Sequence, residues 1–430
     1  MQVCHVQAVA SQGGAGTGAR LLSRRCVVLF GVAAALFAAC LPARAEEPIR
    51  ETVVDAAWDA VFNRTEGWIG GDAIYSTPLP SGDVLWLFAD TIIGKVRDGR
   101  RADLQMVNNT LARHALPQAG AAPDPQSVKF LWGSPSDAEK AKAWIVPEPV
   151  PGDAAPSKEW FWVGDALVAP SAQGRDRLIV FLWRIASTSG EVFGFRAVGN
   201  ALAIIDDPAA DWTTWRPRQV VVTHAVPVSS ADVGRKPEVT WGSKMLLIDE
   251  PAGEPQILIY GYRQPTKSPT QLELVLARAP AAAIEEMEQW QFRTVDAWSS
   301  SLDDAASQAD GLTTEFSVTR IGTKEAPRWV LIHSEPALGE RIFARTARSP
   351  YGPWSARKEV YHVPGIDKEK KHFTYAAKAH PELSRPDELL VSYVVNSFDF
   401  GEGLTNAGIY RPRFIRMPAS ILPEPPRIAE

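Results

Sequence analysis

Residues 70–91 read GGDAIYSTPLPSGDVLWLFADT. Aromatic and β-branched residues on both sides of a cluster of Pro, Ser, Gly and Asp are typical of two antiparallel strands joined by a tight turn, here near Ser81 and Gly82. Residues that are equally far from a hairpin turn face each other across the two strands. The spacing therefore predicts that Asp72 and Asp90 are near neighbours at the open end of the hairpin.

Two neighbouring carboxylates repel each other, so each raises the pKa of the other. One acid that holds its proton beside one that has lost it is the pair that general acid-base chemistry requires. The alternative is structural, with one aspartate capping a turn through its own backbone and the other solvated. The spacing alone leaves both interpretations open.

The hairpin recurs in altered form, and this repetition predicts the architecture. The first strand of each copy carries an anchor residue that meets a polar partner 18 or 19 positions later; the five pairs are Asp72/Asp90, Asp165/Arg184, Ser243/Tyr262, Glu315/His333 and Lys378/Asn396. A third strand follows each hairpin, and tryptophans in three copies mark a fourth, at residues 211–215, 289–292 and 352–354.

Four antiparallel strands repeated without a helical period are typical of a β-propeller. We therefore predict an all-β fold, a five-bladed β-propeller of four-stranded antiparallel blades. The last copy ends after its third strand. Residues 51–57 are predicted to supply the missing outer strand and to close the ring.

The first 45 residues differ from the rest of the chain. They contain no acidic residue, and basic residues precede an apolar run at residues 26–41, which is followed by Ala-Arg-Ala at residues 43–45. This order predicts a secretory signal peptide that is removed, so that residues 46–430 form one domain in the periplasm or outside the cell. The apolar run is too short for a spanning helix.

The route of export stays open. Residues 23–25 partly match a twin-arginine signal, and residues 36–40 loosely resemble a lipoprotein cleavage site. All three cysteines precede the predicted cleavage site, so the mature chain is expected to have no disulfide and no thiolate metal site.

Charge and motifs exclude several classes of partner. Without the four arginines of the predicted signal peptide, the net charge changes from -5 to -9, and no basic stripe for nucleic acid is present. No later apolar segment is long enough to span a membrane, and we expect a monomer. No metal-binding motif occurs, so we predict no cofactor; a calcium ion held by oxygen ligands in the central channel is left open.

Several motifs resemble a bacterial family of five-bladed propellers, domain of unknown function 4185 and its relatives: GGD at 70–72, WLFADT at 86–91, TEFSV at 314–318, AKAHPEL at 377–383 and IYRPRF at 409–414. Some members of that group are endo-D-arabinanases, so the resemblance implies a glycoside-hydrolase-like fold. The resemblance thus implies a furanoside, arabinan-like substrate and catalytic carboxylates at Asp72 and Asp90. It departs at Ala89, where relatives often carry Gly. Other propeller glycosidases take their catalytic acids from three separate blades. That arrangement does not transfer to this sequence, because the third copy has Ser243 in place of an acid.

We therefore predict an exported glycoside hydrolase in which Asp72 is the base or nucleophile and Asp90 the acid, with the order of these two roles left open. Asp165 and Glu315 are further catalytic candidates. Side chains that offer contacts to an oligosaccharide or polysaccharide are Asn109, Trp183, Arg184, Trp241, Tyr262, Arg263, His333, Lys378, His380, Asn396 and Arg411. The alternatives are a non-catalytic carbohydrate-binding or scaffold propeller, or a lyase or transferase on the same fold.

Overall fold

The computed structural model describes residues 51–116, 122–133, 140–148, 159–188, 194–224, 238–249, 253–265, 271–323 and 326–427. Over these ranges the chain forms six antiparallel β-sheets and two short α-helices. The prediction of an all-β antiparallel fold is therefore confirmed. The predicted signal peptide, residues 1–45, lies outside the described residues. No helix within the described ranges is long and apolar enough to cross a membrane.

The first hairpin has the predicted pairing. β3 (Tyr75–Pro78) and β4 (Val84–Phe88) are antiparallel neighbours joined by a turn over residues 79–83. The predicted first strand, however, starts too early, because Ala73 and Ile74 adopt positive φ angles of 68° and 55° and cannot continue a strand.

Beyond this break the same two segments pair again, as β2 (Glu66–Gly71) and β5 (Thr91–Arg97). With β6 (Arg100–Val107) they form a three-stranded sheet that the sequence did not predict. Asp72 and Asp90 therefore lie at the junction of two sheets.

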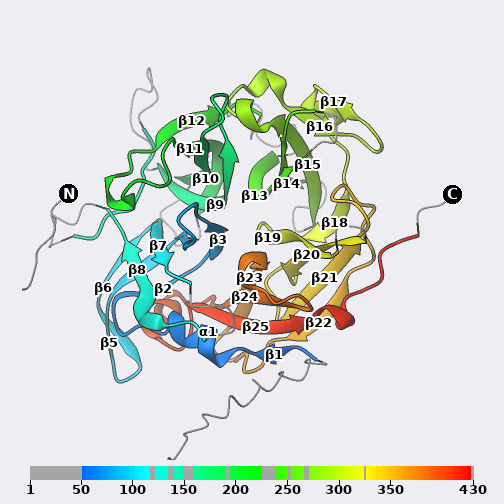
Figure 1. The fold of residues 1–430 in the computed structure, drawn as a ribbon. Helices are drawn as coiled ribbons and strands as arrows, with labels where there is room; N and C mark the ends of the chain where they lie inside the picture. Colours follow the sequence, from blue (N-terminus) through cyan, green and yellow to red (C-terminus); the bar gives the residue numbers. More distant parts are fainter. Residues whose placement is uncertain are drawn as a thin grey trace, which may run out of the picture. The chain divides into compact units, whose positions relative to one another are not determined.

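Five sheets have the consecutive strand order that the repeats predicted; four of them have the predicted four strands, whereas the third has six. From the inner strand outward, the first sheet consists of β3, β4, β7 (Thr110–His114) and β8 (Val128–Leu131), and the second of β9 (Glu159–Pro170), β10 (Asp176–Ser187), β11 (Phe195–Ile205) and β12 (Arg218–Val222). The third consists of β13 (Glu238–Ile248), β14 (Gln256–Gln264), β15 (Leu272–Pro280), β16 (Gln291–Arg293) and β17 (Trp298–Ser299), with β18 (Ala309–Leu312) beside β15. The fourth consists of β19 (Phe316–Gly322), β20 (Pro327–Ser334), β21 (Arg341–Ala347) and β22 (Lys358–His362), and the fifth of β23 (His372–Ala379), β24 (Glu388–Ser397), β25 (Pro412–Pro418) and β1 (Val53–Val54). Figure 1 shows these sheets around a common centre, with β3, β9, β13, β19 and β23 closest to it.

The N-terminal end of the described chain joins the last sheet, as predicted. β1 pairs with β25, so the first and last segments share one sheet. The following helix, α1 (Ala56–Val61), buries Trp58 against Trp86 and Phe414, with ring centroids 5.9 and 5.6 Å apart. Burying a large apolar side chain in this way stabilises a fold by roughly 1.5–3 kcal/mol.

The tryptophans predicted to mark the outer strands instead precede them. Trp212 lies in a 3₁₀ turn before β12, and Trp290 ends the turn before β16. Both side chains are buried, so their role here is packing.

The inner strands share an irregularity at or directly before the anchor positions. The pairing register shifts in β9, β13 and β23, where two residues are left out of the ladder, and β19 begins just after its anchor. A bulge of this kind bends a strand and re-aims its side chains. The residues it re-aims include Asp165, Ser243 and, at the break before β3, Asp72.

Candidate functional site

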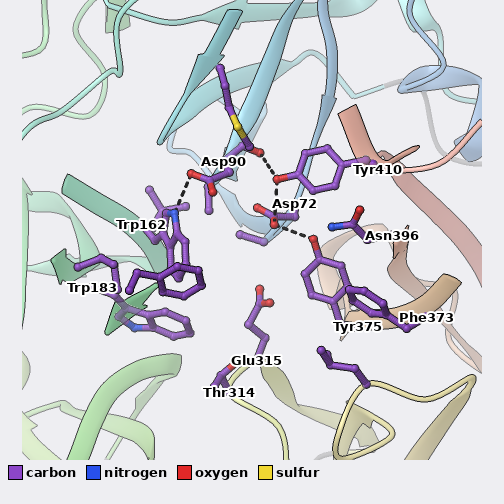
Figure 2. A pocket seen from close by; sticks show the side chains of 18 of the residues that line it. Asp72, Asp90, Trp162, Trp183, Thr314, Glu315, Phe373, Tyr375, Asn396 and Tyr410 are labelled. Carbon is purple, nitrogen blue, oxygen red and sulfur yellow. Dashed lines mark hydrogen bonds between the residues drawn. The ribbon is translucent and has the colours of Figure 1, made fainter. Parts of the chain in front are cut away.

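A pocket of about 390 Å³ opens beside the first hairpin's two aspartates. Asp72, Asp90 and Glu315 contribute carboxylates to its lining, and most other lining residues are aromatic or aliphatic. Figure 2 shows Asp72 and Asp90 side by side, with Glu315 projecting toward them from another sheet. The chain thus brings three acidic side chains into one largely apolar cavity.

Asp72 is held by two tyrosines, one on β23 and one in the loop that leads into β25. Tyr375 donates to Asp72 Oδ2 at 2.7 Å, and the Tyr410 hydroxyl lies 3.2 Å from the same oxygen. Asp72 Oδ1 is buried and has no hydrogen-bond partner among the described residues. Burial, then the charges of Asp90 and Glu315, raise the pKa of Asp72 well above its ordinary value, against a smaller lowering by the tyrosines.

The position of Tyr410 indicates where a proton is held. Its hydroxyl oxygen lies 3.2 Å from Asp72 Oδ2 and 3.1 Å from the backbone carbonyl oxygen of Asp90. A tyrosine hydroxyl has one proton, and a carbonyl oxygen can only accept. Both contacts become hydrogen bonds at once if Tyr410 donates to the carbonyl and a protonated Asp72 donates to Tyr410.

Asp90 has a different set of partners. Its Oδ1 accepts hydrogen bonds from Asn108 Nδ2 at 2.9 Å and from the indole nitrogen of Trp162 at 2.8 Å. Both groups are donors only, so they favour the ionised carboxylate. Burial raises the pKa of Asp90 to about 6, and these two hydrogen bonds oppose the rise.

Glu315 forms an ion pair with Lys378, with 2.8 Å between Oε1 and Nζ. The two side chains are 12% and 3% exposed. Lys378 also lies over the ring of Tyr75, 4.4 Å from its centroid. Burial lowers the pKa of Lys378, while Glu315 raises it. The predicted pairing of Lys378 with Glu315 is present, and Lys378 supports the pocket without lining it.

Asp165 lies outside the pocket, contrary to its predicted place beside the catalytic pair. Its carboxylate pairs with Lys244 at 2.9 Å and accepts from the backbone amide of Met245 at 2.7 Å. Only 1% of its side chain is exposed. Burial raises its pKa and Lys244 lowers it. The bulge in β9 turns it toward β13, which explains the difference.

Three of the predicted substrate-binding residues line the pocket: Trp183, Tyr262 and Asn396. Trp183 donates its indole N–H to the carbonyl oxygen of Trp241 at 2.9 Å, which leaves its ring to form part of the wall. Their contacts with a substrate stay predictions.

Asn109 and Trp241 lie outside the pocket's described lining. Asn109 is fully buried and donates to the carbonyl oxygens of Ile145 and Phe161, at 2.9 and 2.8 Å, so it ties neighbouring segments together. Trp241 is fully buried, and its indole donates to the carbonyl oxygen of His224 at 2.8 Å.

The predicted arginine contacts also lie elsewhere. Arg184 forms an ion pair with Glu159, and Arg263 pairs with Glu273 at 2.6 Å. In both pairs the partner is on an adjacent strand of the same sheet, so each charge is neutralised locally. Arg411 lies outside the described lining as well, and burial lowers its pKa.

Both predicted histidines are structural neighbours of the core. His333 is fully buried, with Nδ1 2.7 Å from the carbonyl oxygen of Ser334, and burial lowers its pKa to about 3. His380 lies between the hydroxyls of Ser76 and Ser392, at 2.6 and 2.7 Å. Burial also lowers the pKa of His380, so both rings are neutral near pH 7.

Sequence reasoning missed the direct partners of the aspartates: Asn108, Trp162, Tyr375 and Tyr410. Trp162 and Tyr375 each lie three positions before an anchor residue of their copy, which is the signal that was available. The bulges hid this signal, because they change which side chains of an inner strand point to the pocket. Within the described ranges, no three His, Cys, Asp or Glu side chains cluster as metal ligands. The channel calcium ion stays a prediction.

Residues 55–419 match the model of a family described as a domain of unknown function, DUF5005. The resemblance to domain of unknown function 4185 was therefore wrong, since the matching family is a different one. That resemblance therefore no longer supports the catalytic roles and the arabinan-like substrate that it implied. No curated protein matches the sequence.

Several solved structures are similar to this chain at low sequence identity, and the first of them has the same fold. A putative hydrolase from Bacteroides ovatus is 20% identical, with a TM-score of 0.62 over 85% of this chain and 90% of that chain. An α-L-arabinofuranosidase from Lactobacillus brevis is 11% identical, with a TM-score of 0.42 over 84% and 96% of the two chains. A GH43_1 enzyme from Xanthomonas citri complexed with xylotriose is 14% identical, with a TM-score of 0.40 over 84% and 90%.

Proposed function

The chain belongs to the DUF5005 family, and we propose that it is a glycoside hydrolase that uses Asp72 and Asp90. One observation carries the proposal: two carboxylates share a pocket, but burial and the neighbouring charges favour the protonated form of Asp72, whereas two hydrogen-bond donors favour the ionised form of Asp90. Glycosidic bond cleavage requires such a pair, one acid to protonate the leaving oxygen and one carboxylate opposite it. The similar fold of the Bacteroides ovatus protein supports the hydrolase class.

Asp72 is the general acid in this proposal. The hydroxyls of Tyr375 and Tyr410 can donate or accept, so they accommodate Asp72 both before and after it gives up its proton. Asp90 is the base or nucleophile, because the donor-only groups of Asn108 and Trp162 hold it as an anion. This order is the reverse of the roles first assigned from the sequence.

The reaction follows from these protonation states. Asp72 transfers its proton to the glycosidic oxygen as the bond to the anomeric carbon breaks. Asp90 takes a proton from water or attacks the anomeric carbon itself. Glu315, in an ion pair with Lys378, places a further acidic side chain in the pocket, where its oxygens face the positive charge of the oxocarbenium-like transition state.

The aromatic walls supply a surface for the sugar. Trp162 and Trp183 line the pocket beside the acids, and an aromatic ring can pack against the C–H face of a sugar. An arabinan-like furanoside substrate, export by the N-terminal segment and a monomeric state stay predictions. Sequencing the N-terminus of the mature protein tests the cleavage site expected before residue 46.

The test of the proposed function is a substrate panel. The purified chain is incubated with arabinan, arabinogalactan, fructan and simple alkyl and aryl glycosides, and released reducing ends are measured. On the polysaccharides and the alkyl glycosides, Asp72→Asn and Asp90→Asn are each expected to lower the rate by roughly 10²–10⁴-fold, the usual contribution of an acid or base. The matched control is Asp176→Asn, an exposed aspartate that does not line the pocket.

Two outcomes would overturn the proposal. One is hydrolysis that both substitutions leave at the wild-type rate. The other is saturable sugar binding without any bond cleavage, which would favour the non-catalytic carbohydrate-binding propeller.

A further inference from the structure

Four of the apolar side chains that line the pocket are exposed to solvent. Met106, Phe195, Leu338 and Phe400 all line it, and they are 40%, 36%, 38% and 39% exposed. They come from four separate places in the chain: β6, β11, the turn between β20 and β21, and α2 (Phe400–Thr405). We call these four residues the apolar rim. Apolar side chains left in water beside a cavity mark a binding surface.

The backbone conformation of Leu338 is strained. Leu338 and Ala337 both adopt left-handed backbone conformations, with φ angles of 62° and 63°. Glycine and asparagine are the usual residues for such a position, and a large aliphatic residue there is strained. Strain of this kind persists at ligand-binding positions, where the side chain is needed. The turn thus presents an aliphatic side chain to the pocket where a polar residue would be less strained.

The charges of the pocket restrict the ligand further. Asp72, Asp90 and Glu315 line its inner part, and Arg196 is the single cationic side chain among the described lining residues. An anionic ligand would be repelled by the acids. A second sugar on the rim could pack only its C–H faces there, because the four side chains offer no hydrogen bond to its hydroxyl groups, and any hydroxyl group buried against them would be unfavourable.

We propose that the substrate is a neutral glycoside with an apolar aglycone, an alkyl or aryl group that packs on the apolar rim while the sugar lies beside Asp72 and Asp90. The proposal rests on the proposed function and concerns the group attached to the sugar. Burial of apolar area favours such an aglycone over a second sugar. A short arabinan chain is therefore expected to be a poorer substrate than an alkyl arabinofuranoside.

The experiment compares octyl and methyl glycosides of one sugar, each below its critical micelle concentration. Binding is measured by calorimetry on the Asp72→Asn variant, and KM is measured on the wild-type chain. The octyl compound is expected to bind about tenfold or more tightly than the methyl compound, since several methylene groups are buried. In the double variant Met106→Ser, Leu338→Asn this ratio is expected to fall to about two or three.

Asparagine is tolerated in the left-handed conformation, so Leu338→Asn preserves the turn. The matched control is Val295→Asn, which replaces an apolar side chain that is 82% exposed and does not line the pocket; its ratio is expected to equal that of the wild type. Equal binding of octyl and methyl glycosides, or a ratio that the double variant keeps, would overturn the proposal. Tight octyl binding without hydrolysis would refute the proposed function and leave the rim's role standing.

Discussion

Asp72 and Asp90 lie opposite each other, nine residues on either side of Ser81, and the amide nitrogen of Asp72 is 3.4 Å from the carbonyl oxygen of Asp90. The ladder of β3 and β4 ends on one side of this pair, and the ladder of β2 and β5 begins on the other. The backbone therefore fixes the two carboxylates relative to each other, and their surroundings determine their different chemistry.

Removal of one hydrogen bond should move the pH profile. The Trp162→Phe variant keeps an aromatic ring at this position but removes the indole N–H that donates to the ionised form of Asp90. The pKa of Asp90 should therefore rise above about 6. We expect the ascending limb of kcat/KM to shift to higher pH by roughly 1–2 units, since a hydrogen bond to a charged group contributes about 1.5–3 kcal/mol and one pKa unit corresponds to about 1.4 kcal/mol.

Trp183→Phe is the matched control. Trp183 also lines the pocket, but its indole donates to the backbone of Trp241 and not to a carboxylate. In Trp183→Phe the ascending limb of the kcat/KM profile should have its midpoint at the same pH as in the wild type. Equal shifts in both variants would show that the indole of Trp162 does not stabilise the Asp90 anion.

The stability of the protein should also depend on Asp90. Its pKa in the folded state, about 6, exceeds the value of roughly 3.9 for an unfolded chain, so ionisation is disfavoured by folding. The stability that Asp90 contributes is fully present below about pH 4 and is lost as the pH rises through about 6. Urea unfolding should thus show that the free energy of unfolding of the wild type falls between about pH 4 and pH 7, and that this fall is smaller in Asp90→Asn. Identical pH dependence in the two proteins would contradict this prediction.

The register of the first hairpin could be predicted, because alternation and turn residues act over a few positions. The partners of Asp72 could not, since Tyr375 and Tyr410 are 303 and 338 residues away in the sequence. Only the closing of the ring, in which β1 and β25 share a sheet, brings the last sheet beside the first.

The sequence predicted substrate contacts for Arg184 and Arg263 because their ion-pair partners could not be recognised from it. Arg184 and Arg263 find partners on neighbouring strands, in Glu159 and Glu273. Each acid lies far enough from its arginine in the sequence that the pairing depends on strand register. Bulges such as the one in β9 shift that register, and no residue pattern revealed them.

Breaking the buried ion pair should be costly. In Lys378→Met the carboxylate of Glu315 stays largely buried without its partner, and we expect a loss of about 3–5 kcal/mol in the free energy of unfolding. The double variant Lys378→Met, Glu315→Leu should recover much of this loss, because it leaves no unpaired charge. A double variant as unstable as the single one would indicate that Lys378 contributes through packing on Tyr75 instead.

Arg101 should prove essential for the loop that carries Tyr410. It is 4% exposed and donates to backbone carbonyl oxygens of Ile69, Gly403, Leu404, Asn406, Ile409 and Tyr410. Arg101→Met leaves several of these acceptors unsatisfied, so we expect about 3 kcal/mol or more of destabilisation in urea unfolding. Arg97→Met, which removes an exposed ion pair with Asp103, should cost less than about 1 kcal/mol. Similar losses in the two variants would refute a special role for Arg101.

The central claim is that Asp72 protonates the leaving group and Asp90 does not. It is tested most directly by kcat/KM on aryl glycosides with good leaving groups and on alkyl glycosides with poor ones. Asp72→Asn should lose roughly 10³-fold on the alkyl compounds and about tenfold or less on the best aryl compounds, which need no proton to leave. Asp90→Asn should lose roughly 10³-fold on both. Equal losses for Asp72→Asn on both kinds of substrate, or the leaving-group dependence appearing in Asp90→Asn instead, would contradict the account.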